Sequence, residues 1–490
     1  MKHNQDEIEN EKERILNYIK STIKGIREQT NALILWCGFE LPVYPLAGIL
    51  DNHNNKYQIG AITWLNNEIR QILSKNFNAF FIDINLCIAR VGARNFYDKR
   101  YWYIGHAPYS KEACRDISFE IVKHIKAFRG KSKKCIILDC DNVLWGGIIG
   151  EDGLSRIKLG KSYPGLAFYE FQLEILNLYH RGIILAICSK NNDSDVWEVF
   201  ENHPYMLLKR EHISAFRINW DDKATNIKSI SHELNVGMDS IVFVDDNQHE
   251  IELVNQALPE VETIHMQKNK PYEYRETIAS CGFFDVLKIT DEDKIRGQMY
   301  GAQTQRSNFA KEFVDLEDYY KSLEMEVTVG FSNNFNIPRI AQLTQRSNQF
   351  NLTTKRYSLD DIKVLSESSE SDVIYIQLKD CFGDFGIIGV AILKYEKEKA
   401  VIDTFLLSCR ALGRKVEDIL LMECIKLSRL KGKSAIIGQY IPSSRNMQVK
   451  NFYQSKGFSA TGEGHYYKYD LYHDKYEIPG VFKSITSEVD

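Results

Sequence analysis

The chain has 490 residues, more than one hydrophobic core usually organises, so we expect two to four domains. Hydrophobic residues make up 44% of it and charged residues 26%, close to the average for soluble globular proteins, which argues against a disordered, collagen-like or coiled-coil chain. Because 62 basic residues stand against 66 acidic ones, the net charge is −4, and nucleic acid is a poor candidate ligand.

The ten cysteines are scattered singly, without a CxxC pair. This distribution argues against a disulfide framework or a structural zinc site and favours a reducing compartment. The first 20 residues are charged and helical in pattern, and they lack the apolar stretch of a secretory signal. No segment has the roughly 18 apolar residues of a membrane span. We therefore expect a cytoplasmic protein that does not contact a membrane.

Residues 1–130 are predicted to form an N-terminal α/β segment. Isoleucine and leucine recur at helical spacing among charged residues in the first 30 positions, which indicates an amphipathic helix. The other elements expected here, in chain order, are a strand at 32–37, a helix at 62–73, a strand at 77–86 and a helix at 117–128. The polar sequence GKSKK follows the last helix and marks a boundary near residue 130.

Residues 131–320 alternate apolar strands with helices. The strands expected are 135–140, 184–189 and 240–246, and the helices are 164–180, 193–200 and 224–234. Continuous apolar strands alternating with helices predict a parallel sheet that is covered on both faces and binds ligands at the carboxyl ends of its strands. Residues 283–320 are charged and short of strand formers, so we expect a helical connector there.

Residues 321–472 mix strands and helices in an order that predicts a separate α+β domain. The elements expected are strands at 327–331, 373–378, 387–395 and 401–407, a helix at 416–430 and a strand at 434–440. Residues 473–490 are expected to be a tail. The whole chain is therefore predicted to be an α/β protein in three parts.

Two acidic residues, Asp139 and Asp141, leave the end of the first apolar strand of the central part. Burying two like charges without a cation costs several kcal/mol. A divalent cation resolves this conflict, and Mg²⁺ would also offset the repulsion between a carboxylate and an incoming phosphate. The alternative is a pair of solvated carboxylates in a turn.

Further polar residues stand where the following strands end or the next helix begins. Ser189 ends the second strand, Lys223 begins a helix, and Asp245 and Asp246 end the third strand. In a phosphoryl-transfer site, Ser189 can donate to a phosphate oxygen and Lys223 can neutralise the charge that builds up during transfer. Asp245 or Asp246 can complete the coordination of a metal. Taken singly, these residues could equally be a capping serine, a surface lysine and an acidic turn.

These four motifs, in this order, resemble those of the haloacid-dehalogenase (HAD) superfamily. The resemblance implies a Rossmann-like parallel sheet in which Asp139 is the nucleophile and Asp141 the general acid and base. It also implies that Ser189 and Lys223 bind phosphate, and that an aspartyl phosphate forms and is then hydrolysed. The implied Mg²⁺ ligands are Asp139, the main-chain carbonyl of Asp141, and Asp245 or Asp246.

The sequence around these motifs resembles the FkbH-like branch of the superfamily. The similar segments are DCDNVLWGGIIGEDG (139–153), LAICSKNN (185–192) and FVDDNQHE (243–250), with others at 100–110, 350–358, 382–393 and 405–421. The resemblance implies an enzyme of polyketide-type biosynthesis that dephosphorylates 1,3-bisphosphoglycerate. Such an enzyme transfers the glyceryl group to the phosphopantetheine thiol of an acyl carrier protein, which would be the partner of this chain.

The same resemblance implies a cysteine that holds the acyl group in transit. Cys140 lies between the two motif acids and is the first candidate, and Cys188, beside Ser189, is the second. The thiolate is the reactive form, and neighbouring carboxylates raise the pKa of a thiol unless Mg²⁺ or Lys223 offsets them. The alternative for both cysteines is a small residue buried in a strand.

The segment between the first motif and the next helix is short and rich in glycine, so it can form a hairpin flap but not a cap domain. An open site suits a macromolecular partner that carries its acyl group on a long arm. Trp145, directly after the motif, is expected to pack the flap on the sheet, with a lid or a contact to a partner as the alternative.

The C-terminal part resembles an N-acetyltransferase fold, and the N-terminal part is distantly similar to SGNH-type hydrolases. Arg410, Gly413 and Arg414 lie in the turn where N-acetyltransferases bind a coenzyme pyrophosphate. Because Lys415 replaces a small residue of that turn, we expect a docking module for the carrier protein or its pantetheine arm, or else a scaffold without a ligand. His106, in the N-terminal part, is expected to be structural.

Two other functions are left open by the sequence. One is a Mg²⁺-dependent HAD phosphatase that acts on a small phosphorylated metabolite or a phosphoprotein, in which Cys140 has no catalytic role. The other is a non-catalytic docking subunit whose acidic cluster only stabilises the fold. The presence of both Asp139 and Asp141 argues against the second.

Overall fold

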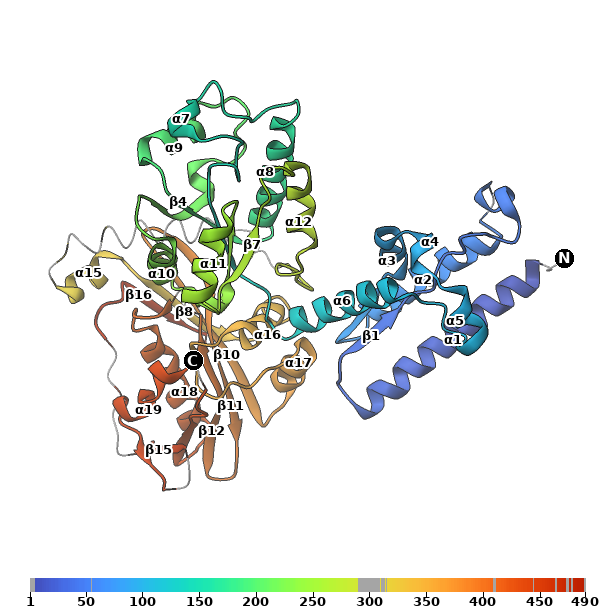
Figure 1. The fold of residues 1–490 in the computed structure, drawn as a ribbon. Helices are drawn as coiled ribbons and strands as arrows, with labels where there is room; N and C mark the ends of the chain where they lie inside the picture. Colours follow the sequence, from blue (N-terminus) through green and yellow to red (C-terminus); the bar gives the residue numbers. More distant parts are fainter. Residues whose placement is uncertain are drawn as a thin grey trace. The chain divides into compact units, whose positions relative to one another are not determined.

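The computed structural model describes residues 5–53, 55–289, 309, 313, 315–408, 411–443, 445–462, 465–472, 476 and 479–488. The chain divides into two compact units, Met1–Lys126 and Ala127–Asp490 (Figure 1). None of the helices described is both long enough and apolar enough to cross a membrane.

The first unit contains two parallel strands and several helices. Its elements are α1 (Gln5–Gln29), β1 (Ile34–Cys37), η1 (Gly48–His53), α2 (Gln58–Ser74), β2 (Ala79–Ile82), α3 (Ile84–Val91), α4 (Ala93–Phe96), α5 (Lys99–Gly105) and α6 (Lys111–Phe128). Ile19 of α1 and Ile69 of α2 are buried in one core cluster with the start of β2. The strand β2 ends earlier than predicted because Asp83 caps α3, its side chain accepting a hydrogen bond from the Asn85 N–H.

The second unit contains two sheets. The first, which we call the small sheet, has the order β5-β4-β3-β6-β7 among the described residues, with every pairing parallel. Its strands are β3 (Cys135–Leu138), β4 (Ile184–Ser189), β5 (Ile213–Ile218), β6 (Ile241–Asp245) and β7 (Glu262–His265). These pairings confirm the predicted α/β class with a parallel sheet. The sequence did not predict the two edge strands, because Ser214 and Arg217 interrupt β5 and β7 begins and ends with polar residues.

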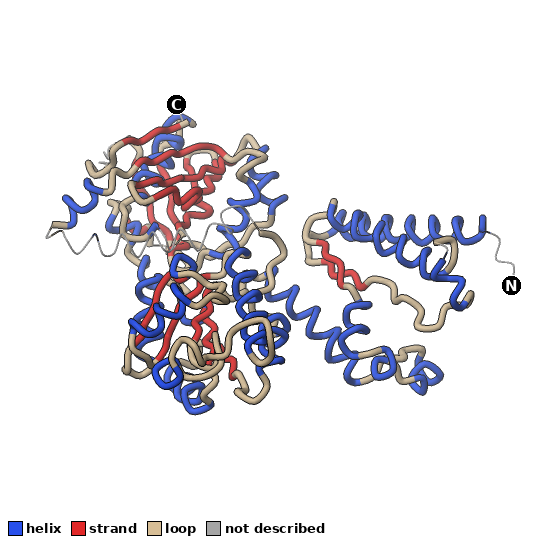
Figure 2. Tube along the Cα trace, turned by 90° about the horizontal axis from the view of Figure 1, so that it is seen from above, coloured by secondary structure: helices blue, strands red, loops and turns tan. Residues whose placement is uncertain are grey.

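Helices cover both faces of the small sheet, as the continuous apolar strands predict (Figure 2). They are α8 (Gly165–His180), α9 (Asp193–Asn202) and α12 (Tyr274–Ser280) on one face, and α10 (Lys223–Leu234) and α11 (Gln248–Ala257) on the other. Successive residues of β3 alternate between the two cores: Leu138 packs with Phe171 of α8, and Ile137 packs with Ile227 of α10. With both faces filled, a ligand has access to the strand ends.

The second sheet, which we call the large sheet, has nine strands among the described residues. Its strands are β8 (Glu326–Phe331), β9 (Phe350–Asn351), β10 (Ser371–Asp380), β11 (Gly383–Tyr395), β12 (Lys399–Leu407), β13 (Ala435–Gln439), β14 (Ser459–Ala460), β15 (Tyr466–Asp470) and β16 (Ser484–Ser487). Helix α18 (Val416–Leu430) covers the face that includes Ala391, whereas α16 (Ile337–Arg346) and α17 (Leu359–Glu367) cover the face that includes Val390. The predicted helix at 416–430 is therefore confirmed.

In the second unit the structure also contains elements that the sequence did not predict, among them α17 and the strands β9, β14 and β15. Where the sequence predicts a tail at 473–490, β16 pairs in parallel with β8, and Val481 is only 3% exposed. The helix α16 was not predicted, because Pro338 reads as a helix breaker although it lies in the first turn, where proline is tolerated. Most of the predicted connector at 283–320 lies outside the described residues, and α15 (Leu316–Ser322) is at its end.

Candidate active site

Three neighbouring strands of the small sheet end in polar residues. Asp139 follows β3 directly, Ser189 is the last residue of β4, and Asp245 is the last residue of β6. Because β4, β3 and β6 are parallel neighbours, their carboxyl ends lie at the same edge of the sheet. The Asp139 N–H donates to the carbonyl oxygen of Val244 at 3.0 Å, which holds Asp139 beside the end of β6.

Lys223 joins these side chains from the first position of α10, directly after the N-cap residue Asp222. Its Nζ atom lies 3.1 Å from Asp139 Oδ2 and 2.5 Å from Asp245 Oδ2. On the other side of the carboxylate, the Ser189 hydroxyl donates to Asp139 Oδ1 at 2.6 Å. The two residues predicted to bind phosphate therefore both contact the predicted nucleophile.

The charged groups of this cluster are buried. Burial lowers the pKa of an ammonium group and raises the pKa of a carboxyl group. Burial alone would lower the pKa of Lys223, but the carboxylates of Asp139 and Asp245 raise it on balance, so Lys223 stays protonated. Burial and the charge of Asp139 raise the pKa of Asp245 to about 7, although Lys223 acts against this rise. One ammonium group therefore does not offset the negative charge of the cluster, and a further cation would stabilise it.

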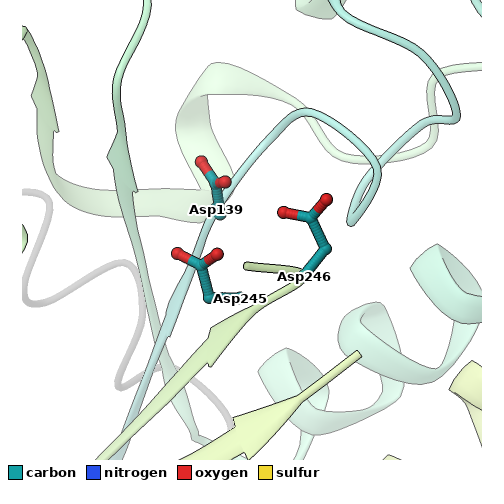
Figure 3. Close-up of side chains that lie close together, drawn as sticks. All are labelled: Asp139, Asp245 and Asp246. Atoms are coloured by element: carbon teal, nitrogen blue, oxygen red, sulfur yellow. The ribbon is translucent and has the colours of Figure 1, made fainter. Parts of the chain in front are cut away.

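Asp139, Asp245 and Asp246 form an acidic cluster in which the ligand oxygens lie within 4.8 Å of one another. Figure 3 shows the three side chains close together, Asp139 on the loop after β3 and the other two at the end of β6. Asp246 also lies 2.8 Å from the Nζ atom of Lys268. Carboxylate oxygens at this spacing are a donor set that fits Mg²⁺. The sequence leaves the choice between Asp245 and Asp246 open, and the structure places both in the cluster.

Asp141 lies in the loop after β3, and three donors hold its carboxylate. The Trp145 indole N–H donates to Oδ1 at 2.9 Å and the Ile149 N–H at 3.1 Å, while Asn191 Nδ2 donates to Oδ2 at 3.0 Å. Burial nevertheless raises the pKa of Asp141, which moves it towards the range in which a carboxyl group can donate a proton. Trp145 is completely buried in the core, as expected, and does not form a lid.

Asp139, Asp141, Ser189 and Lys223 all line one cavity of about 480 Å³. Its wall also includes side chains that the sequence analysis did not single out: Ile148, Lys190, Asn191, Trp220, Asn247, Glu250 and Lys268. Trp220 is 71% exposed, which is unusual for so large an apolar side chain beside a polar site. The four predicted residues thus share a space large enough for a phosphate group with an attached organic group.

Asn191 is the most informative of the residues that sequence reasoning missed. Its Nδ2 atom lies 3.0 Å from Ser189 Oγ as well as 3.0 Å from Asp141 Oδ2, and its side chain is only 6% exposed. Asn191 therefore links Asp141, the predicted general acid, to the hydroxyl group of Ser189. Its position two residues after the end of a strand was the available signal in the sequence.

The two cysteines proposed as acyl carriers are completely buried and lie on opposite faces of the small sheet. Burial raises the pKa of Cys140 far above its usual range, and the charge of Asp139 adds to this. Burial also raises the pKa of Cys188 to about 12. Both effects disfavour the reactive thiolate. The structure therefore gives no support to acyl transfer through either thiol, and that role stays a prediction.

The turn predicted to bind a coenzyme phosphate precedes α18. Arg410 lies outside the described residues, and Gly413 is exposed with a φ of 75°, a conformation that favours glycine. The side chain of Arg414 is buried, with its NH1 atom 3.0 Å from Asp380 Oδ2 and its guanidinium over the ring of Phe385. These contacts direct Arg414 into the protein, so the structure gives no support to a contact between Arg414 and a phosphate.

His106, in the first unit, ends α5 in the left-handed conformation with a φ of 52°. Its ring lies edge-on to that of Trp102, with 5.1 Å between the ring centroids. These are local contacts at the end of a helix, in keeping with the structural role expected from the sequence.

The sequence matches no family model and no curated protein. Among solved structures it is similar to the N-terminal part of the protein BF1531 from Bacteroides fragilis, which contains a phosphatase domain and is complexed with Mg. The identity is 32% and the TM-score 0.54, and the match covers 58% of this chain and 75% of that one. The chain is also similar to the ribosomal-protein-S18-alanine N-acetyltransferase from Escherichia coli. The identity is 13% and the TM-score 0.24, and the match covers 31% of this chain and 98% of that one. At 32% identity over three quarters of the Bacteroides fragilis chain, the protein belongs to the same family of HAD-like phosphatase-domain proteins.

Proposed function

We propose that the protein is a Mg²⁺-dependent phosphatase that hydrolyses phosphate monoesters through a phosphoaspartyl intermediate on Asp139. The observation that carries the proposal is the contact of Asp139 with both Ser189 and Lys223 inside a cavity that Asp141 also lines. The likeness to a Mg-complexed phosphatase domain from Bacteroides fragilis supports it independently.

In the first step, a carboxylate oxygen of Asp139 attacks the phosphorus atom of the ester. The bond between phosphorus and the leaving oxygen breaks, and the carboxyl group of Asp141 gives its proton to that oxygen. Ser189 and Lys223 lie where their hydroxyl and ammonium groups can donate to the oxygens of the transferring group. The product of this step is an alcohol and a phosphorylated Asp139.

In the second step, the ionised carboxylate of Asp141 takes a proton from a water molecule, which attacks the phosphorus atom of the intermediate. The bond between phosphorus and Asp139 breaks, inorganic phosphate leaves, and both carboxyl groups return to their starting states. The hydrogen bonds from Trp145 and Asn191 hold Asp141 in one orientation for both proton transfers.

Asp139, Asp245 and Asp246 are the carboxylates that would hold the metal. A bound Mg²⁺ ion supplies positive charge that offsets the repulsion between the Asp139 carboxylate and the phosphate. Lys268, at 2.8 Å from Asp246, orients one of these ligands from outside the cluster.

A narrower proposal comes from the sequence resemblance: the substrate would be 1,3-bisphosphoglycerate, and the glyceryl group would pass to the phosphopantetheine thiol of an acyl carrier protein. The short flap supports it, because the only helix between Asp141 and α8 among the described residues is α7 (Ile149–Asp152), too little for a cap domain. The buried thiols of Cys140 and Cys188 do not support a cysteine-bound step. The carrier-protein partner and the cytoplasmic location stay predictions.

Phosphate release from a panel of phosphate esters, with Mg²⁺ or with a chelator, tests the first proposal. The wild-type protein should release phosphate only with Mg²⁺, Asp139→Asn should release none, and Asp318→Asn, a change at an exposed residue of α15, should match the wild type. Activity of Asp139→Asn equal to the wild type would overturn the proposal.

The narrower proposal, glyceryl transfer, is tested by mass spectrometry of an acyl carrier protein that has been incubated with the enzyme and 1,3-bisphosphoglycerate. The absence of a glyceryl adduct on the carrier protein would contradict it.

A further inference from the structure

A second cavity of about 480 Å³ lies in the second unit, between the helices of the small sheet and those of the large sheet. It shares no lining residue with the cavity that contains Asp139. One wall is the segment 235–240, which includes the short helix η3 (Met238–Ser240), and the opposite wall is α16 with the residues that follow it. The volume falls in the range of pockets that bind small molecules.

Four basic side chains line this second cavity: Lys134, Arg339, Arg346 and Arg445. Arg339 and Arg346 are seven residues apart on α16, which places them on one face of the helix, about 10 Å apart along its axis. Arg339 is only 6% exposed, and its guanidinium group donates to Gln342 Oε1 and, at 3.4 Å, to the carbonyl oxygen of Ile387. The Nζ atom of Lys134 lies 3.4 Å from the carbonyl oxygen of Arg346, so these two residues lie side by side. The basic residues of the cavity therefore come from different segments of the chain.

Positive charge is in excess around this cavity. Among the described lining residues, the acidic ones are Asp239, which lies 2.5 Å from Arg445, and Glu260, which is exposed. Arg356, close by, donates to the carbonyl oxygen of Ser347 at 3.0 Å, and burial and the charge of Arg445 lower its pKa. Burial lowers the pKa of Arg346 to about 10. Like charges thus crowd a partly desolvated space, where an anion would relieve their repulsion.

We propose that this cavity is a binding site for a ligand with two or more negative charges, of the class of organic diphosphates. The planar guanidinium group donates two parallel hydrogen bonds to a phosphate, which makes arginine the common residue in such sites. Arg346, from α16, and Arg445, from another segment of the chain, can contact two linked phosphate groups at once. Removal of the ligand from water strengthens each of these contacts. The site is separate from the chemistry at Asp139 and goes beyond the proposed phosphatase function.

Isothermal titration of the full-length protein with inorganic pyrophosphate, in the presence of a chelator, tests the proposal. Pyrophosphate should bind at least tenfold more tightly than inorganic phosphate or succinate, and the affinity should fall as the salt concentration rises. Arg346→Gln should weaken binding about tenfold or more, and Arg346→Lys, which keeps the charge, should weaken it less. Lys397→Gln, a change at an exposed residue away from the cavity, should bind as the wild type does.

Asp239→Asn is the sharper test, because tighter binding is not expected if the basic residues of the cavity only stabilise the fold. Removing this acid leaves Arg445 to the ligand and increases the positive charge of the cavity, so pyrophosphate should bind more tightly. Lys223→Met, which removes the cation of the candidate active site, should retain the binding. The proposal is overturned if folded Arg346→Gln binds pyrophosphate as well as the wild type, or if binding is lost in Lys223→Met and kept in Arg346→Gln.

Discussion

The indole N–H of Trp145 donates a hydrogen bond to Asp141 Oδ1 at 2.9 Å, although the Trp145 side chain is completely buried. A core residue thus orients a carboxylate that faces the active-site cavity. Packing of the flap and orientation of the proposed general acid therefore depend on the same side chain.

Trp145→Phe should lower kcat for phosphate release about tenfold, because the phenyl ring packs but cannot donate to Asp141. Trp197→Phe is the matched control, since the Trp197 indole is also buried and donates to Asp193 Oδ1 at 2.9 Å, outside the site. Both variants should lose stability to a similar extent in thermal unfolding. Equal kcat values for the two variants would contradict a positioning role for Trp145.

Mg²⁺ should raise the Tm of the wild-type protein, because an ion that binds only the folded state stabilises that state. Asp245→Asn and Asp246→Asn each remove one carboxylate of the cluster and should raise the Mg²⁺ concentration needed for this effect about tenfold or more. Asp318→Asn should leave it unchanged. Thermal unfolding at a series of Mg²⁺ concentrations measures the effect, and the same shift in all four proteins would contradict a metal site at this cluster.

The cysteines should differ widely in their rate of reaction with a thiol reagent in the native protein. Cys37, Cys114 and Cys381 are exposed, whereas Cys140 and Cys188 are completely buried and have raised pKa values. Peptide mapping after timed labelling should therefore show the exposed cysteines modified first. Rapid labelling of Cys140 would indicate an accessible thiol and would favour the acyl-carrier role.

The large sheet should lose stability below about pH 4, partly through Asp403. Burial alone would raise the pKa of Asp403, but hydrogen bonds from Lys355, Tyr357 and Lys394 lower it on balance. A carboxyl group whose pKa is lower in the folded state contributes stability above its unfolded pKa, and this contribution is lost as the pH falls through the folded pKa. Asp403→Asn should therefore lower Tm at about pH 7 and matter much less at about pH 3. An equal loss of Tm at both pH values would contradict this.

Most side chains of the candidate active site could be predicted from the sequence because each stands at a local signal, the end of an apolar strand or the start of a helix. Asp139, Ser189 and Asp245 follow from this rule together with the parallel order of the strands. The double contact of Asn191 could not be predicted, since it depends on how two loops meet.

Secondary-structure elements that depend on distant parts of the chain also could not be predicted from the sequence. The strand β16 has few apolar residues, and it exists because it pairs with β8, more than 150 residues earlier in the chain. Arg414 has the residue type and position of a phosphate ligand, but the direction of its side chain is set by Asp380, the last residue of β10. Local pattern indicates which residues stand at strand ends, whereas long-range pairing decides where their side chains point.

The proposed mechanism depends on phosphorylation of Asp139, and rapid acid quenching followed by peptide mass spectrometry tests this step most directly. In Asp141→Asn the second step lacks its general base, so a phosphoryl group should accumulate on the peptide that contains Asp139 during incubation with Mg²⁺ and a phosphate ester that has a good leaving group. Asp139→Asn should show no such adduct. A phosphoryl group on another residue, or phosphate release by Asp139→Asn at the wild-type rate, would contradict the account.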